Sequence, residues 1–455
     1  MTTNTTTPAP DAAEDTPQAA NAPPDGERFA VRAPGAGAGQ VVARRGRLRW
    51  REVARALGPG IITGGADNDP AGITTYSVVG AQSGFSLNWL LLISTPLLIV
   101  IQQMAARIGN VTKSDLASAI RMRYGARLAV LAVLLTVLAN LLTIGADLQM
   151  MAAVAALIFG GGFTAYIVPF AAVMGYITIF GNYKLFARFL LWLAAVFALY
   201  IVAAVLARPN WGQVLAQTVI PHIHPTATYF IAAVGLLGTT ITPYLFFWQT
   251  SGEVEERRGV QSMARTRLDI TAGMIWSNVT AFFIIVVTGT LLYNHHTTIT
   301  TAADAAKALG PVAGPYAKYL FAVGIIGAGL LAVPVLAAST AYSIAGIFGW
   351  RRSLARRVHN APEFYIVLGV ALMISVQLAV IGADPVKTLF YSQVLDGLIA
   401  PLLVVLLVLL TSSRKVMGDF INSRAATIIG WIAVGVLVAA DVAMVFSIVT
   451  SGFPG

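Results

Sequence analysis

The chain has 455 residues, of which 57% are hydrophobic and only 11% are charged. A soluble globular domain carries about a quarter charged residues, so this composition excludes a soluble enzyme and points to a membrane protein. The chain contains no cysteine, which excludes disulfides and thiolate metal sites.

Residues 1–40 are rich in Thr, Ala, Pro and Gly and poor in large apolar side chains, so a disordered tail is expected there. The tail lacks the apolar core of a signal peptide. Residues 41–56 carry a run of arginines from Arg44 to Arg55. Although the net charge is +10, basic residues directly before an apolar span are typical of a cytoplasmic juxtamembrane anchor, not of a nucleic-acid-binding arm.

From residue 57 onward, repeated apolar stretches of roughly 20 residues predict an all-α integral membrane protein with no separate soluble domain. Eleven transmembrane helices are expected, over residues 57–80, 86–106, 128–158, 165–182, 185–207, 226–250, 270–293, 316–348, 364–382, 386–411 and 426–450.

The distribution of basic residues predicts the orientation of these spans. If the N-terminus is cytoplasmic, all but four of the 30 Lys and Arg residues lie on the cytoplasmic side. The exceptions are Arg208, Lys307, Lys318 and Lys387. The positive-inside rule therefore places the N-terminus inside, and the odd number of spans places the C-terminus outside.

The first span contains an acid next to a proline, Asp69-Pro70, within a glycine-rich segment. A carboxylate at membrane depth is costly unless it is used, and the proline interrupts the helix and frees backbone carbonyls. The sixth span contains Pro243 after three threonines, so a second break is expected near Thr239–Thr242.

Broken spans one and six are five spans apart, which indicates inverted repeats with a site between them near the middle of the membrane. Repeat one would cover about 57–207 and repeat two about 226–411, with an extra helix at about 426–450; together they form a transporter domain at 57–450. The predicted ligands are the Asp69 carboxylate, the Thr242 hydroxyl, and the carbonyls near Ala66 and Thr239. Such hard oxygen donors suit Mg²⁺, Ca²⁺ or Mn²⁺.

Several short motifs lie between about Leu57 and the C-terminus: Gly58-Pro59-Gly60, Asp69-Pro70-Ala71-Gly72, Asp147-Leu148, Thr242-Pro243-Tyr244, and Ser392-Gln393-Val394 with Pro401. In these motifs the sequence resembles the Nramp family of divalent-metal transporters. The resemblance implies a LeuT-like fold with a 5+5 inverted repeat and broken helices 1 and 6.

The sequence departs from the family pattern at the expected site. Gly72 stands where the family has Asn, Thr242 where it has Met, and Tyr244 where it has His. Met150 stands where the family has a Glu implicated in proton movement. These departures resemble the Nramp-related magnesium transporter branch, which implies a wider site for a partly hydrated ion and makes proton coupling doubtful.

Several other polar residues are candidates for the surroundings of the site or the ion pathway. Asp67 could lie directly behind the ligands or in a vestibule, Asp147 could line the pathway or pair with Arg188, and Gln393 and Asp396 share one face of span ten. Two sets are interpreted as structural: Ser277 and Asn278 as helix-packing groups, and the acidic cluster Glu253, Glu255 and Glu256 as a solvated face.

The function expected from the sequence is import of Mg²⁺ or Mn²⁺ across a bacterial inner (plasma) membrane by alternating access. No cofactor, nucleic acid or obligatory protein partner is expected; the partners are the metal ion and the lipid bilayer. The alternatives are a proton-coupled Mn²⁺/Fe²⁺ transporter and a Na⁺-coupled organic-solute symporter of the same fold. No phosphate-binding loop, zinc-protease motif or nucleophile elbow in a fitting context supports an enzyme.

Overall fold

The computed structural model describes residues 59–180, 196–257, 259–293, 299–354, 357–382 and 384–452, and within these ranges every regular element is a helix. The predicted tail at 1–40 and the basic segment at 41–56 lie outside the described residues, as does Arg188.

The helices that form the body of the molecule follow one another along the chain. They are α2 (Pro59–Ala66), α3 (Pro70–Ser83), α4 (Asn88–Thr112), α5 (Leu116–Tyr124), α6 (Ala126–Phe159), α7 (Thr164–Phe180), a helical segment at Val196–Leu206, α9 (Trp211–Val219), α10 (Ala227–Thr240), α11 (Pro243–Glu255), α12 (Met263–Leu291), α13 (Ala302–Ala306), α14 (Gly310–Ala313), α15 (Ala317–Phe348), α16 (Pro362–Ile381), α17 (Pro385–Ser412), α18 (Arg414–Met417) and α19 (Arg424–Ser451). Short 3₁₀ turns lie at Val260–Ser262, Lys307–Leu309, Gly314–Tyr316 and Val358–Asn360.

Eight helical stretches of the described chain are long and apolar enough to cross a membrane, counting α10 with α11 as one stretch. Two shorter apolar helices lie at Thr164–Phe180 and Val196–Leu206. The structure thus supports a polytopic helical membrane protein, and the number of eleven crossings stays a prediction.

Three predicted spans are longer in the structure than the apolar pattern indicated. α4 continues to Thr112 instead of 106, α11 to Glu255 instead of 250, and α12 begins at Met263 instead of 270. Hydropathy detects only the apolar part of a helix, whereas backbone hydrogen bonding continues through the polar turns at its end.

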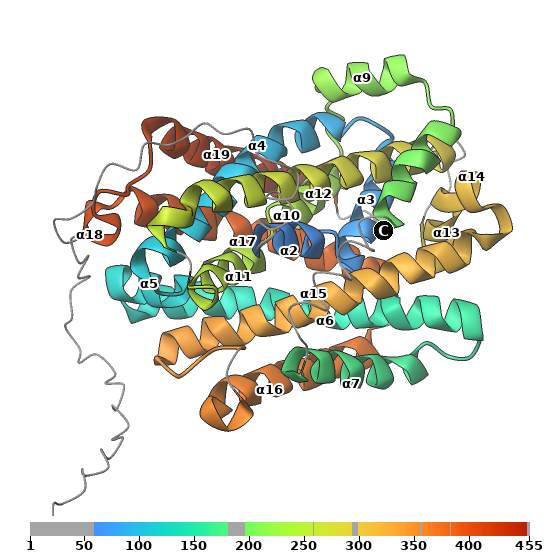
Figure 1. Cartoon of the computed structure of the whole chain (residues 1–455). Coiled ribbons are helices and arrows are strands. Elements are labelled where there is room, and N and C mark those ends of the chain that lie inside the picture. The colour runs from blue at the N-terminus through green and yellow to red at the C-terminus, as the bar shows by residue number, and fades with distance from the viewer. Residues whose placement is uncertain are drawn as a thin grey trace, which may run out of the picture.

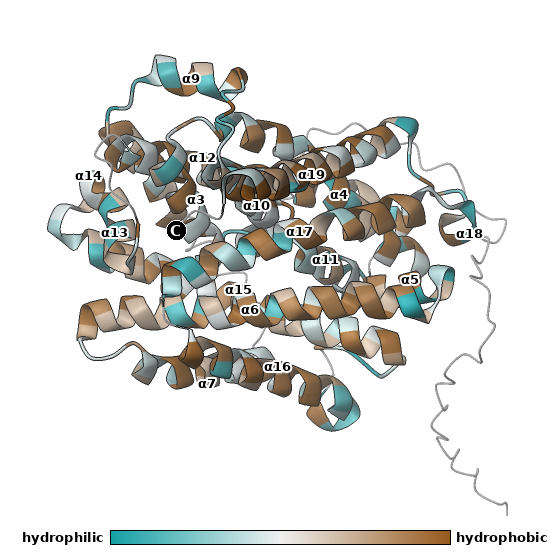
Figure 2. Ribbon diagram, turned by 180° about the vertical axis from the view of Figure 1, so that it is seen from behind, coloured by the Kyte–Doolittle hydropathy of each residue, from teal (hydrophilic) through white to brown (hydrophobic). Residues whose placement is uncertain are grey.

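The two interrupted helices lie at the centre of the bundle (Figure 1). The α10–α11 stretch is 94% buried within its apolar window, whereas that of α19 is 22% buried. α6 and α15 lie on one side of the centre, with α7 and α16 outside them (Figure 1). Apolar residues are prominent along these peripheral helices, as Figure 2 shows, which suits surfaces that face lipid chains.

Small residues allow the broken helices to pack closely against their neighbours. A Cβ at Gly64 of α2 would lie 2.4 Å from the Gly273 carbonyl oxygen of α12. A Cβ at Gly238 of α10 would lie 1.9 Å from the Gln393 carbonyl oxygen of α17. Backbone therefore meets backbone at both places, and only glycine fits.

The two ends of the bundle differ in charge. α5 and α18 lie at one end, and α9, α13 and α14 lie at the other (Figure 1). The basic residues of the α5/α18 end include Lys113, Arg121, Arg123, Arg265, Arg267, Arg352, Arg414, Lys415 and Arg424. Among the described residues, the opposite end carries Arg208, Lys307, Lys318 and Lys387.

Candidate functional site at the two helix breaks

The first break lies between α2 and α3, at Asp67, Asn68 and Asp69. Asp69 has extended backbone angles (φ −71°, ψ 172°) and is the N-cap of α3: its Oδ1 accepts a hydrogen bond of 2.5 Å from the Gly72 N–H. Pro70 occupies the first helical position, where its missing N–H costs nothing. An N-capping acid followed by proline therefore restarts the helix in a new direction.

The second break separates α10 from α11. α10 ends at Thr240, Ile241 and Thr242 have non-helical angles, and Pro243 begins α11. The Thr242 hydroxyl donates to the Thr239 carbonyl at 2.9 Å, so it is engaged within its own break. The predicted interruption near Thr239–Thr242 is confirmed, and Pro243 stands at the first position of the second half-helix.

Tyr244 connects the two breaks. Its phenol donates to the Ala66 carbonyl oxygen at 2.9 Å, and Asp69 Oδ2 lies 3.5 Å from the same hydroxyl. Asp69 is only 2% exposed, and Tyr244 is buried as well. An anionic oxygen, a freed carbonyl at the end of a helix and a phenol thus meet in the occluded centre of the bundle.

Gly72 does not leave the open space that its small size suggested. A Cβ at this position would lie 3.0 Å from the Asp67 carbonyl oxygen, 3.0 Å from Thr239 Oγ1 and 3.1 Å from Asp69 Oδ1. Oxygen atoms from both breaks surround this glycine. In this conformation the expected widening of the site is therefore absent around Gly72, because the two breaks close upon it.

Asp67 is a buried group, and in this structure it does not line an open vestibule. It is 1% exposed and accepts a hydrogen bond from the Ser277 hydroxyl of α12. Its Oδ1 and both amide atoms of Asn68 have no hydrogen-bond partner in the described structure. Ser277 thus joins α12 to the unwound segment, which agrees with its interpretation as a polar group that packs helices together.

Two further buried carboxylates lie near the first break. Asp147 of α6 accepts from the Ala71 N–H at 3.0 Å through Oδ1, and Asp396 of α17 accepts from Thr143 at 3.4 Å through Oδ2. Asp147 is within electrostatic range of both Asp69 and Asp396. The second oxygen of each of these two carboxylates has no partner among the described residues.

Asp147 thus contacts α3. The pairing with Arg188 that the sequence suggested as one possibility stays a prediction, because Arg188 lies outside the described residues. Gln393 is buried on α17, where its Nε2 donates to Ser392 at 3.4 Å and its Oε1 is without a partner in the described structure. Thr143 is a neighbour of these acids that the sequence reasoning missed, and its only signal was a hydroxyl in an apolar span.

The acidic cluster at the end of α11 is a solvated face only in part, because Glu256 is exposed whereas Glu253 and Glu255 are not. Glu253 is fully buried, and its carboxylate accepts from Asn110 at 2.9 Å and from Gln249 at 2.8 Å. Glu255 accepts from the Tyr342 hydroxyl at 2.6 Å. Burial lowers the pKa of the nearby Lys113 ammonium, although the Glu253 carboxylate opposes this shift. The prediction failed for Glu253 and Glu255 because α11 continues as a helix past its apolar part and turns these two acids toward α4 and α15.

The donor set at the breaks contains few charges. Within the described residues, no group of three or more His, Cys, Asp or Glu side chains is arranged to hold a metal ion. A cation at the breaks would meet one carboxylate oxygen together with neutral carbonyl and hydroxyl oxygens. These are weak, hard ligands, and they suit an ion that retains part of its water shell.

Comparison with known proteins identifies the fold and the family. The model of the family described as "Natural resistance-associated macrophage protein-like", Nramp, matches residues 60–447, which is most of the chain. The chain belongs to the Nramp family. It is therefore a multi-pass membrane transporter, not an enzyme, and carries no cofactor.

One relative of this Nramp protein is the divalent metal cation transporter MntH of Deinococcus radiodurans, 28% identical over 86% of this chain and 89% of the relative. Among solved structures, a histidine-to-alanine mutant of the manganese transporter of Eremococcus coleocola superposes with a TM-score of 0.70 at 20% identity, covering 90% of each chain. The crystal structure of MhsT in complex with L-phenylalanine superposes with a TM-score of 0.56 at 15% identity over 90% of this chain and all of the other.

Proposed function

We propose that this Nramp protein is a secondary transporter that imports a divalent metal cation, Mg²⁺ or Mn²⁺, by alternating access. The observation that carries the proposal is the meeting of Asp69 Oδ2, the Ala66 carbonyl and the Tyr244 hydroxyl where the two broken helices face each other. The names of the relatives agree with the class of substrate, since one is a divalent metal cation transporter and another a manganese transporter.

The arrangement assigns different roles to the oxygens of the site. Asp69 Oδ1 is used to cap α3, so Oδ2 is the oxygen available to a cation. The Ala66 carbonyl becomes available when the Tyr244 phenol turns its proton to a water of the ion's shell. The Thr239 and Thr242 oxygens complete the shell from the second break.

The chemistry of these ligands favours a hard, partly hydrated ion. Mg²⁺ sheds water reluctantly and is bound through one or two carboxylates with several waters retained. A thioether would favour softer transition metals, and Thr242 supplies a hydroxyl at that position. The site therefore admits Mg²⁺ beside Mn²⁺.

The occluded state of the site supports alternating access. Asp69 is buried from both ends of the bundle, and each interrupted helix has a non-helical joint at the site. Bending at these joints would open the site to one side at a time.

Proton coupling is the point that separates this function from a second candidate. Met150 and Tyr244 stand where the family has a Glu and a His, and neither side chain accepts a proton near neutral pH, which favours transport without protons. One carboxylate oxygen each of Asp147 and Asp396 has no hydrogen-bond partner among the described residues. A buried carboxylate with no cationic side chain beside it is suited to binding a proton, which favours the second candidate, a proton-coupled Mn²⁺/Fe²⁺ transporter. A Na⁺-coupled organic-solute symporter has only the shared fold in its favour.

Flux into proteoliposomes tests the proposal. The full chain is reconstituted, and uptake of Mg²⁺, Mn²⁺ and Ca²⁺ is followed with ion-sensitive dyes, with and without an imposed pH gradient. Saturable uptake of Mg²⁺ and Mn²⁺ that the gradient leaves unchanged is expected. Uptake of Mn²⁺ alone with acidification of the lumen would establish the second candidate, and uptake of an amino acid without metal flux would establish the symporter.

The proposed setting is the plasma membrane, with the N-terminus in the cytoplasm and the C-terminus outside. The supporting feature is the concentration of basic residues at the α5/α18 end of the bundle, which the positive-inside rule assigns to the cytoplasm.

A further inference from the structure

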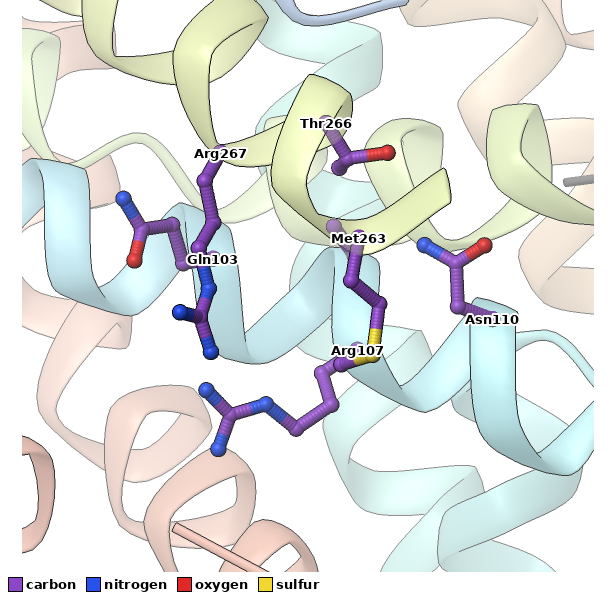
Figure 3. Close-up of a pocket in the computed structure, with 7 residues that line it drawn as sticks. Gln103, Arg107, Asn110, Met263, Thr266 and Arg267 are labelled. Carbon is purple, nitrogen blue, oxygen red and sulfur yellow. The ribbon is translucent and has the colours of Figure 1, made fainter. Parts of the chain in front are cut away.

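A recess outside the ion site lies between the last turns of α4 and the first turns of α12 (Figure 3). It is a shallow recess open to solvent, and its empty space is about 210 Å³ when the solvent at its mouth is included. Gln103, Arg107 and Asn110 line it from α4, and Thr266 and Arg267 line it from α12. It belongs to the basic α5/α18 end of the bundle, far along α12 from Ser277 and the helix breaks.

Two guanidinium groups converge in this recess, as Figure 3 shows for Arg107 and Arg267. Arg107 is 8% exposed and donates to Asn422 Oδ1 at 2.7 Å and to the Ile421 carbonyl at 3.4 Å. Arg267 is exposed and makes no hydrogen bond or ion pair with the described residues. The two cations repel each other, and no described carboxylate pairs with either of them.

The acid next to the recess does not compensate for this charge. Glu253 lies behind the lining, where Asn110 donates to it at 2.9 Å and Thr266 at 3.3 Å. Its carboxylate is thus directed to the interior of the bundle. Two like charges held together at the rim of a bundle lower their free energy when an anion binds between them.

The position of the recess indicates which anion would reach it. On α12, Leu268 directly follows Arg267 and is 55% exposed, and Ile275 is 45% exposed two turns further along. Exposed apolar residues on a helix long enough to cross a membrane suit a face in contact with lipid chains. The recess therefore lies where the lipid-facing surface gives way to the basic end, at the depth of the lipid headgroups.

We propose that this recess binds the phosphate group of an anionic phospholipid. Arg107 and Arg267 donate to the phosphate oxygens, because a guanidinium offers paired N–H groups that match two oxygens. The Gln103 and Asn110 amides line the same space, and the acyl chains lie along Leu268 and Ile275. Basic recesses between helices at the cytoplasmic face are suited to such headgroups. The bound lipid bridges α4 and α12.

The test compares two neighbouring arginines on α12. Arg267→Gln removes a charge from the recess, and Arg265→Gln removes the same charge two residues earlier, outside the lining. Binding of phosphatidylglycerol, with phosphatidylcholine as the neutral comparison, is titrated by native mass spectrometry of the full chain in detergent. Phosphatidylglycerol should bind R267Q about tenfold more weakly than the parent, as expected for one lost charge-assisted contact, and R265Q unchanged.

A second arm separates lipid from free phosphate. Thermal unfolding is measured with added phosphatidylglycerol or with inorganic phosphate alone. Stabilisation by the lipid that R267Q loses and R265Q keeps supports the proposal. Equal lipid binding by the parent, R267Q and R265Q would overturn it, as would stabilisation by inorganic phosphate with none by the lipid, since the recess would then serve a soluble anion.

Discussion

At the scale of single residues, Asp69 combines a structural and a functional role. One carboxylate oxygen caps α3 at 2.5 Å and the other faces the Tyr244 hydroxyl at 3.5 Å. Loss of an N-cap side chain costs about 1 kcal/mol, so a substitution by alanine would mix a folding effect with the loss of a ligand.

Replacement of Asp69 by asparagine separates these two roles. Asn keeps an oxygen that accepts from the Gly72 N–H but removes the charge that a divalent cation requires. We expect D69N to keep the thermal stability of the parent and to lose at least about tenfold in metal uptake, since a charged ligand is worth more than about 1.4 kcal/mol in binding. D69N with parental uptake in proteoliposomes would remove Asp69 from the ion site.

Thr242 is the residue that should set the choice between metals. Replacing its hydroxyl by a thioether in T242M should raise the ratio of Mn²⁺ to Mg²⁺ uptake several-fold, because sulfur is a soft ligand that discriminates against Mg²⁺. T242V, which has the shape of threonine without the hydroxyl, controls for loss of the 2.9 Å bond to the Thr239 carbonyl. A Mn²⁺/Mg²⁺ uptake ratio that is the same in all three proteins would contradict the assignment of Thr242 as a ligand.

At the scale of elements, each break is held by a helix that does not belong to it. Asp67 accepts from Ser277 of α12, Ala71 donates to Asp147 of α6, and α10 lies directly against the backbone of α17 at Gly238. The orientation of the half-helices is therefore set by packing between elements, and the glycines at the contacts are as important as the ligands.

Two glycine-to-alanine variants test this packing. G238A would bring a Cβ to 1.9 Å from the Gln393 carbonyl, so α10 and α17 must separate. We expect G238A to destabilise the protein by about 1–3 kcal/mol or more, because an overpacked core forces side chains and backbone out of place. Transport should be lost as well. The control is G369A on α16, where a Cβ meets no atom within 4 Å. There, removal of a helix glycine should be neutral or stabilise by about 0.5–1 kcal/mol.

Thermal unfolding of both glycine variants in detergent measures the difference. If G238A unfolds at the same temperature as G369A, the helices separate there without cost, and the close contact is not a determinant of the site.

At the scale of the whole molecule, the two ends of the bundle should face different compartments. The chain has no cysteine, so single cysteines report their side of the membrane directly. Lys387 and Lys415 are exposed at opposite ends, one near the start of α17 and the other just after it.

An impermeant thiol reagent added to intact cells should label K387C and leave K415C unlabelled until the cells are opened. The reason is that cytoplasmic ends of membrane helices retain the excess of Lys and Arg. The opposite labelling pattern would invert the orientation, and with it the direction proposed for import.

The sequence by itself determined the class of the molecule and the place of its interruptions. Long apolar stretches can only be helices in a membrane, because lipid offers no hydrogen bonds to an unpaired backbone. Pro70 and Pro243 follow polar residues and each begin a new half-helix, where a missing N–H costs nothing. A proline alone does not interrupt a helix here, because Pro96, Pro169, Pro334 and Pro401 lie inside continuous helices. For these reasons the local sequence pattern was enough to predict the broken helices. It was also enough to predict the family, which the comparisons confirmed.

Only the tertiary structure decided what the buried polar groups contact. The sequence allowed either a solvent-facing or a packing interpretation for Asp67, Glu253 and Ser277. The reason is that the partner of a buried side chain can lie on a helix up to hundreds of residues away in the chain. The same holds for the space at Gly72, which glycine alone suggested was open and which oxygens from both breaks fill. Local chemistry fixes where a helix stops, whereas the packing of distant helices fixes which atoms it meets there.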